Sequence, residues 1–320
     1  MTTDSPPPQE DSRHKLGEYV VPSYAPEHPN KLERVIKWGK IIVFSVFGLA
    51  AVIGLWGHSR WMHDADARVK ALEAASPTAR PERYFDTELE GLPPVVARYF
   101  SKVLNMNQPM VRRLYMEQTG TFNRSTQAPE KWIPFTAWQR VTTKRPGFVW
   151  DAAMTMPPGI TVRVVDAYVG GVGSLQPSVF GLFDVGGVQG GEDIARGELI
   201  RYFAESVWYP TALLPSQGVQ WKTVDAQTAK ATMTDGPLTV TLTFSFNAED
   251  GTIARIGSDE RSALIDGNMV LMPWEVRLSD YQQVSGMVVP YAAEVAWLTP
   301  NGRLPYWRGK VEKLDYEMPR

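Results

Sequence analysis

The segment GELIRYFAESVWYP concentrates the side chains most able to do chemistry in this chain of 320 residues. On a helix, Glu198, Arg201, Glu205 and Trp208 follow i, i+3, i+4 spacing and share one face. That face is either solvated, with its charges paired along the helix, or it carries a partly buried Arg201–Glu205 pair at the mouth of a cavity. In the second case the pair would hold a polar head group, with Trp208 and Tyr209 beside it.

Three residues of predicted strands complete the set of candidate ligand-binding residues. Asp166 shares an alternating face with aliphatic side chains, Glu294 stands among alanines, and Trp150 lies on an apolar strand face. An inward carboxylate would have a raised pKa, whereas one at a strand end would touch water, and the sequence leaves both open. Glu205 with Asp166 or Glu294 would permit glycoside hydrolysis if the two carboxyl groups lay about 5–10 Å apart.

The residue types that are missing exclude most other chemistry. The chain has no cysteine, and its four histidines lie at positions 14, 28, 58 and 63. We therefore expect no thiolate nucleophile, disulfide or zinc-binding set, and we predict no catalytic residue, metal or cofactor. Paired glycines near residues 170 and 190 lack the lysine or acidic partner of phosphate-binding loops. The formal net charge of −2 argues against a nucleic-acid partner, which requires a basic surface.

The elements that must position these candidates are mostly strands. Leu238, Leu242 and Phe244 belong to a run in which apolar residues alternate with Thr and Ser, as in a half-buried strand. Turn dipeptides of the Asp-Gly type recur at regular intervals in the last third of the chain, as in an antiparallel meander. Helical periodicity appears at 92–104 and near 192–206. These patterns predict a mainly β (α+β) fold, a large curved antiparallel sheet or half-barrel with the two helices against its concave side.

An apolar run near the N-terminus predicts a membrane anchor. Residues 41–59 carry no formal charge and, as a helix of about 28 Å, match the hydrocarbon core of a bilayer. Basic residues gather just before the run, so the positive-inside rule predicts a cytoplasmic N-terminus and a periplasmic or extracytoplasmic domain at the inner membrane. The expected parts are a disordered cytoplasmic tail (1–40), the transmembrane helix, a helical linker (60–82) and a β-rich domain (83–320). Cleavage as a signal peptide at the ADA motif of residues 65–67 is left open.

Several motifs together resemble an uncharacterised family of bacterial membrane-anchored proteins. They are LPPVVARYF, QTGTF, WIPFTAWQ, RPGFVWDA, ELIRYFAESVWYPTALL, VVPYAAEVAW and YWRGKVEKLDY, which span roughly residues 90–318. No activity comes with that resemblance. The stretch KRPGFVW at 144–150, with Asp166-Ala167-Tyr168, is more distantly similar to the periplasmic lipoprotein carriers. That resemblance implies a half-barrel whose concave face shelters acyl chains. The chain departs from the carriers in its anchor, its length and its helix near 192–206.

Three functions are compatible with these observations. The first is an anchored extracytoplasmic protein that binds an apolar or lipid-like ligand such as an acyl chain, since burying each CH₂ group contributes about 0.8 kcal/mol without catalytic residues. The second is a structural or interaction protein of an envelope complex, for which a flat apolar patch would be the sign. The third is a carboxylate-based hydrolase of envelope glycans. The residues favour a non-enzyme without deciding the point, and the oligomeric state stays open.

Overall fold

The computed structural model describes residues 30–75, 81–125, 129–156, 160–265 and 268–319. Residues up to Ala51 and residues from Val52 onward form separate compact units. Helix α1 (Lys31–Ala74) is continuous over 44 residues. Residues 31–40, which we expected in the disordered tail, are therefore helical, and the span and the linker helix are one element. The rest of the expected tail lies outside the described residues.

Helix α1 could cross a membrane by its length and composition alone, a test that signal sequences and some core helices also pass. Its character changes after the apolar run. Leu55 and Trp56 are well exposed, whereas Trp61, Ala65 and Leu72 are buried. The second half of α1 is thus amphipathic and has a packing partner in the β-rich domain.

The strands of the described residues form one antiparallel sheet, in the order β6-β5-β4-β3-β2-β1-β14-β13-β12-β11-β10-β9-β8, with β7 beside β5. Their bounds are β1 Arg113–Asn123, β2 Trp132–Thr142, β3 Gly147–Met156, β4 Ile160–Val169, β5 Val172–Val179, β6 Phe183–Asp184, β7 Val188–Gln189, β8 Gln220–Thr223, β9 Thr228–Asp235, β10 Leu238–Phe246, β11 Ile253–Ile265, β12 Asn268–Val284, β13 Met287–Thr299 and β14 Gly302–Glu317. Neighbours are almost all consecutive in sequence, so short turns suffice, as the turn dipeptides predicted. The exceptions are the pairing of β7 with β5 and the pairing of β1 with β14, which joins the two meanders.

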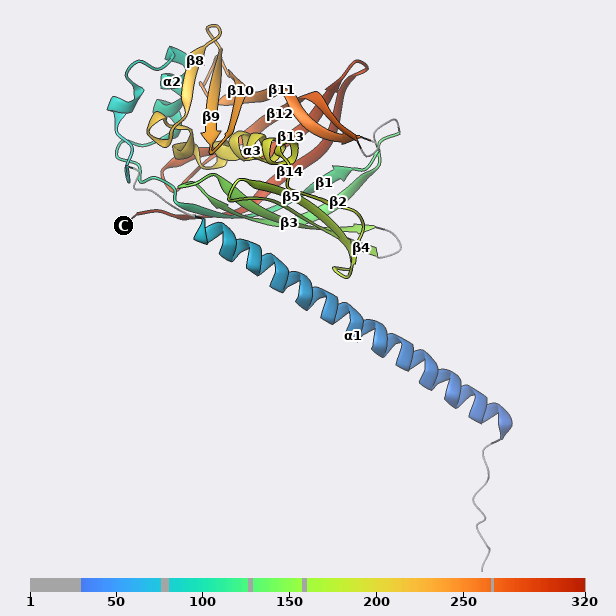
Figure 1. The fold of residues 1–320 in the computed structure, drawn as a ribbon. Coiled ribbons are helices and arrows are strands. Elements are labelled where there is room, and N and C mark those ends of the chain that lie inside the picture. Colours follow the sequence, from blue (N-terminus) through green and yellow to red (C-terminus); the bar gives the residue numbers. More distant parts are fainter. Residues whose placement is uncertain (1–29, 76–80, 126–128, 157–159, 266–267, 320) are drawn as a thin grey trace, which may run out of the picture. The chain divides into compact units, whose positions relative to one another are not determined.

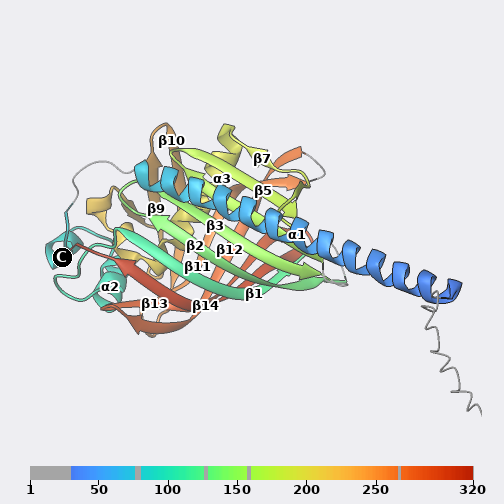
Figure 2. The same ribbon diagram turned by 90° about the horizontal axis from the view of Figure 1, so that it is seen from below.

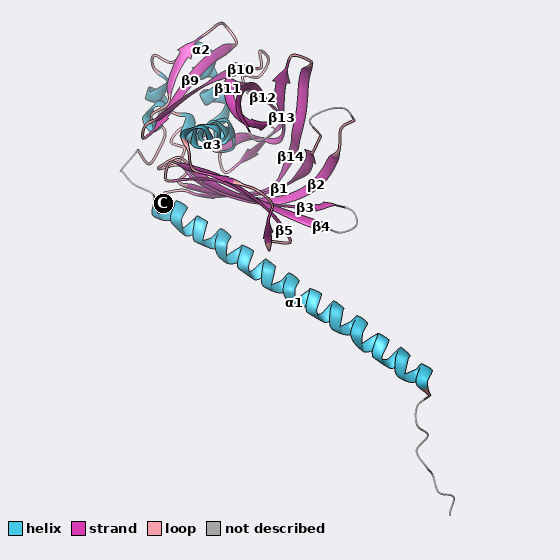
Figure 3. Cartoon of the chain, turned by 45° about the vertical axis from the view of Figure 1, so that its right-hand side comes forward, coloured by secondary structure: helices cyan, strands magenta, loops and turns pink. Residues whose placement is uncertain are grey.

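The sheet curves strongly, so that β3–β5 and β10–β12 face each other across helix α3 (Glu192–Glu205) (Figures 1 and 3). Helix α3 contacts β3, β4 and β5 on one side and β10 and β11 on the other. A side chain at Gly173 would place its Cβ only 2.8 Å from the carbonyl oxygen of Ile194, so this glycine permits the close approach of α3 to β5. The predicted curved sheet with a helix on its concave side is confirmed.

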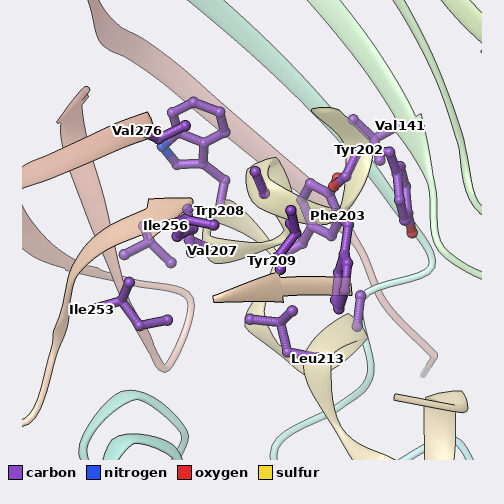
Figure 4. Packing of buried hydrophobic residues seen from close by; sticks show 14 of the residues in the cluster. Val141, Tyr202, Phe203, Val207, Trp208, Tyr209, Leu213, Ile253, Ile256 and Val276 are labelled. Atoms are coloured by element: carbon purple, nitrogen blue, oxygen red, sulfur yellow. The ribbon is translucent and has the colours of Figure 1, made fainter. Parts of the chain in front are cut away.

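The main hydrophobic core lies between the sheet and a segment made of α3 and the residues that follow it (Figure 4). Phe203 packs edge-on against Phe244 with ring centroids 5.8 Å apart, and Trp221 lies 5.0 Å from the same ring. Short 3-10 helices at Ser206–Trp208, Pro210–Leu213 and Pro215–Gln217 continue this apolar segment. Each fully buried side chain of this size stabilises the fold by about 1.5–3 kcal/mol.

Helix α2 (Pro94–Val103) packs against β9 and β13, after a 3-10 turn at Asp86–Leu89. Pro94 occupies its first turn, where a missing N–H is harmless. Its predicted apolar face of Val96, Tyr99, Phe100 and Val103 is buried throughout. The helix expected at 92–104 is therefore present and uses the expected face.

The second half of α1 packs on the outer face of β3–β5 (Figure 2). Trp61 and Leu72 join Val149, Val165 and Ala167 in a small hydrophobic cluster separate from the main core. The indole Nε1 of Trp61 donates a hydrogen bond of 2.8 Å to the carboxylate of Asp151 on β3. Burial raises the pKa of Asp151, and the bond from Trp61 opposes that shift.

Candidate functional site

A cavity of about 630 Å³ lies between helix α3 and the concave face of the sheet. Such a volume falls in the range of small-molecule pockets, about 300–1,000 Å³. Its wall is mostly apolar, with aromatic and aliphatic side chains from β3, β4, β12, β13 and β14. The largest of these are Trp150, Trp274, Trp297, Tyr306 and Trp307, and the 3-10 helix after α3 adds Trp208. Alternate residues of β3, β12 and β13 point inward, whereas the adjacent Tyr306 and Trp307 both line the cavity, where the pairing of β13 with β14 shifts register.

Helix α3 lies between the two halves of the curved sheet, so both of its faces are covered. The face of Leu199, Tyr202 and Phe203 enters the core, as expected. The charged face is not solvated, because Glu198 is only 9% exposed and Arg201 and Glu205 each expose 15% of their side chains. All three line the cavity. The structure therefore supports the second interpretation of this face, a buried charged pair.

Arg201 is the centre of a polar patch on the cavity wall. Its Nε donates a 2.8 Å hydrogen bond to Glu205, and its terminal nitrogen donates to Asp166 on β4. The guanidinium also lies over the rings of Phe148 and Trp150, 4.7 and 4.9 Å from their centroids. Burial alone would lower the pKa of Arg201, but the surrounding carboxylates outweigh burial and raise it. The residue is thus fixed as a cation.

Glu198 and Asp166 form a carboxyl pair within the same patch. Burial raises the pKa of Glu198 well above its usual value, and the charge of Asp166 adds to that shift, against the opposing pull of Arg261 and Arg201. No donor from the described residues reaches Oε2 of Glu198 or Oδ1 of Asp166. A proton kept on Glu198 satisfies both atoms, since a protonated carboxyl donates to its neighbour.

Sequence reasoning missed a second buried cation, Arg261 on β11. This side chain is 9% exposed, donates to the Tyr306 hydroxyl at 2.9 Å, and lies 4.7 Å from the centroid of the Trp274 ring. The pairing of β11 with β12 shifts register between Ser258 and Arg261, which breaks the simple alternation of inward and outward residues. A period of two therefore gave no signal for Arg261.

The structure brings together five of the seven predicted ligand-binding residues. Trp150, Asp166, Arg201, Glu205 and Trp208 all line the cavity.

Tyr209 does not. It is fully buried in the core, and its hydroxyl donates 2.9 Å to the carbonyl oxygen of Tyr202. The chain turns after Trp208, so the structure does not bring Tyr209 together with the other candidates at the cavity wall.

Glu294 is the other candidate that does not line the cavity. Its neighbours Ala293 and Val295 line the cavity, so alternation along β13 places Glu294 on the opposite, outer face. There it accepts hydrogen bonds from Arg303 and, at 2.6 Å, from Arg308. Burial raises the pKa of Glu294, but these two guanidinium groups together outweigh burial and hold the pKa below the usual value. Glu294 and Glu205 therefore do not form a catalytic pair.

The patch suits binding better than hydrolysis. Asp166 and Glu205 are both held by Arg201, so neither is placed as a free nucleophile or base. With Glu198 protonated, Asp166 and Glu205 balance Arg201 and Arg261 in the deep part of the wall, and Arg124 adds a third cation at its exposed end. Within the described residues, no group of three or more His, Asp or Glu side chains is arranged to hold a metal ion.

A family model describes residues 90–316 of this chain, and that family is the family of unknown function DUF6920. The chain belongs to this family. The matched residues contain α2, α3, the whole sheet and every residue that lines the cavity. The first of the two resemblances found in the sequence is thus confirmed for most of the chain, and the DUF6920 family itself carries no assigned activity.

Solved structures give a weaker likeness. A domain from Vibrio parahaemolyticus, named for outer membrane lipoprotein sorting, has a TM-score of 0.38 at 8% identity, over 72% of this chain and 93% of its own. A LolA superfamily protein from Nitrosomonas europaea has a TM-score of 0.34 at 10% identity, over 71% of this chain and 93% of its own. At these scores the likeness carries no functional argument. No curated protein matches the chain.

Proposed function

We propose that this DUF6920 protein is a membrane-anchored, extracytoplasmic protein that binds an apolar or lipid-like ligand in the cavity beside α3. The observation that carries this proposal is the cavity itself, about 630 Å³ with a mostly apolar wall. Each CH₂ group moved from water to such a wall contributes about 0.8 kcal/mol, so an acyl chain would bind without any catalytic group.

The polar patch indicates what the ligand carries at its head. Its two cations and two carboxylates balance, so a strongly anionic head group in the deep part of the cavity would meet no net positive field, and the third cation of the lining, Arg124, lies exposed at the outer end. Arg261 lines the cavity and has an Nε–H without an acceptor among the described residues. We propose a neutral head group with hydroxyl or amide functions, which both donates and accepts hydrogen bonds.

The cellular arrangement belongs to the same proposal. The helix at 41–59 would cross the inner membrane with its N-terminus in the cytoplasm, and the domain at 83–320 would stand in the periplasm or its equivalent. The contact of Trp61 with Asp151 supports an uncleaved chain, because cleavage at residues 65–67 would remove it. Alkaline phosphatase fused after Arg320 should be active in a bacterial host. Green fluorescent protein fused at the same position and exported by the same route should not fluoresce.

Photo-crosslinking of the full chain, purified from membranes in detergent, tests the binding. A fatty alcohol that carries a diazirine should label the cavity wall near Trp150 and Trp297. Ala293→Trp fills the cavity and should abolish this labelling, because Ala293 lines it. Ala292→Trp is the matched control on the other strand face and should leave labelling intact. Equal labelling of both variants would overturn the proposal.

A flat apolar patch would favour the interaction-protein alternative, whereas the structure has a deep cavity instead. The hydrolase alternative would need Asp166 and Glu205 to act apart, although Arg201 binds both. Neither alternative explains an apolar wall with a charge-balanced patch, so lipid-like binding is the function that these features support best.

A further inference from the structure

One end of the sheet carries an unusual number of exposed apolar side chains. The strand ends that follow one another at β1–β2, β3–β4, β5–β6, β11–β12 and β13–β14 all lie at this end, because each pair is antiparallel and β1 runs against β14. We call it the rim. Its exposed apolar residues are Ile160, Phe180, Phe183, Val185, Met269, Val270, Leu271 and Leu298, which are 36–65% exposed.

The cavity opens at the rim. Its deep wall, which includes Trp150, Trp208 and Trp274, is at most 5% exposed. Its lining continues along the strands to Met269, which is 37% exposed, and to Arg124, which is also exposed. A ligand would therefore enter between the strand ends of the rim.

Helix α1 arrives at the same end. Its Gly57 touches the β5–β6 turn so closely that a Cβ there would lie 2.8 Å from the carbonyl oxygen of Phe180. Leu72, four turns later, packs against Gly147 at the far end of β3. From Gly57 to Leu72 the helix thus runs from the rim toward the opposite end of the sheet. The apolar run of residues 41–59 ends beside the rim.

We propose that the rim rests on the surface of the bilayer that holds α1, so that the cavity opens toward the membrane. This inference rests on the anchor proposed above. The occupant of the rim is a lipid bilayer because the chain itself brings one there, at the helix turn that contacts Phe180. Phe, Leu, Ile and Val side chains bury about 5–10 Å into the head-group boundary when they lie on a membrane. A lipid would then enter the cavity without crossing water.

Absence of cysteine makes the test direct, since each introduced cysteine is unique. Phe183→Cys and Leu271→Cys place a fluorescent label on the rim. Val172→Cys and Val224→Cys are matched controls, 46% and 51% exposed and away from it. The full chain is reconstituted in vesicles of phosphatidylcholine and phosphatidylglycerol that contain a lipid with a nitroxide near its head group. Rim labels should be quenched at least about two-fold more than control labels, because they enter the boundary layer.

Equal quenching at all four positions would overturn the inference, and so would a chain that fails to float with the vesicles. The diazirine crosslink measured on the same samples separates the two proposals. Crosslinking in the cavity with unquenched rim labels would support lipid binding and would contradict the proposal that the rim faces the membrane. Quenched rim labels with no crosslink would support the proposal that the rim faces the membrane and would contradict lipid binding in the cavity.

A second pair of variants tests the route. Phe183→Asp with Leu271→Asp should slow labelling by a vesicle-borne diazirine lipid about ten-fold, because each charge is disfavoured at the boundary. The same variant should be labelled normally by the probe in detergent. Val172→Asp with Val224→Asp should change neither rate. An unchanged rate from vesicles in the rim variant would contradict the proposed route.

Discussion

Arg201 determines whether the polar patch of the cavity is stable. One guanidinium pairs with both Asp166 and Glu205 in a place where each side chain is no more than 15% exposed. Removing one partner of a buried ion pair leaves a charge without compensation, which is far more harmful than removing both. Arg201 also covers the aromatic rings of Phe148 and Trp150, so it fills space as well as supplying charge.

Replacing Arg201 should therefore show how strongly the two carboxylates depend on its charge. Arg201→Met should lower the free energy of unfolding by about 3–5 kcal/mol, because two buried carboxylates lose their cation. Adding Glu205→Gln should restore part of the loss, since one of those charges is then removed. Chemical unfolding of the full chain in detergent measures both. A double variant less stable than Arg201→Met would show that the patch is not a charge-compensated unit.

Glu198 predicts a dependence on pH with a definite sign. Its folded pKa is raised above the usual 4.5, so its contribution to stability is complete below about pH 4.5 and is lost as the pH rises through the folded pKa. Glu198→Gln cannot ionise. Its melting temperature should exceed that of the wild type by more at pH 8 than at pH 5.

Glu294 supplies the control, because its pKa is lowered. Its contribution is present above about pH 4.5 and is lost as the pH falls, so Glu294→Gln should be less stable than the wild type at pH 8 and should approach it below pH 4. If the stability of both glutamine variants relative to the wild type changed in the same direction with pH, the assignment of a raised pKa to Glu198 would be wrong.

At the scale of elements, periodicity predicted the strands and both domain helices because burial follows a period of two or 3.6. The inward set Phe148, Trp150, Ala152 and Met154 was readable for this reason. The burial of the charged face of α3 could not be predicted in this way, because a helix pattern shows which residues share a face but not whether another layer covers that face. Arg261 was hidden by a register shift, which depends on the pairing of two strands.

Helix α1 offers a prediction at this scale. Gly57→Ala would place a Cβ 2.5 Å from Leu182 and 2.8 Å from a backbone oxygen, so the helix must move away from the β5–β6 turn. Gly54→Ala is the matched control, since its Cβ would meet nothing within 4 Å and alanine favours helix. Hydrogen exchange of residues 57–72 should quicken in the first variant alone. Equal exchange in both would mean that this segment is not docked through Gly57.

The whole β-rich domain depends on how its two meanders meet. The order of pairing ends at β6 and β8, so the ends of the sheet are joined through α3 and through side chains. Asp235, at the end of β9, accepts a 2.8 Å hydrogen bond from the Tyr168 hydroxyl and a 3.1 Å bond from Arg145. This contact links the β2–β3 turn and β4 with a strand from the other meander, across the open side of the sheet.

If this link holds the two meanders together, its loss should destabilise strands in both of them. Asp235→Asn keeps an acceptor for Tyr168 but loses the charge that pairs with Arg145, which is 32% exposed, so the loss of stability should be about 1–3 kcal/mol. Amide exchange should quicken in β4 and in β9–β10 together, because each meander restrains the other through Asp235. Glu317→Gln breaks an exposed pair with Arg113 and should change stability by less than about 1 kcal/mol. Faster exchange confined to β9–β10 would mean that α3 alone closes the domain, and the shape of the cavity would then be independent of Asp235.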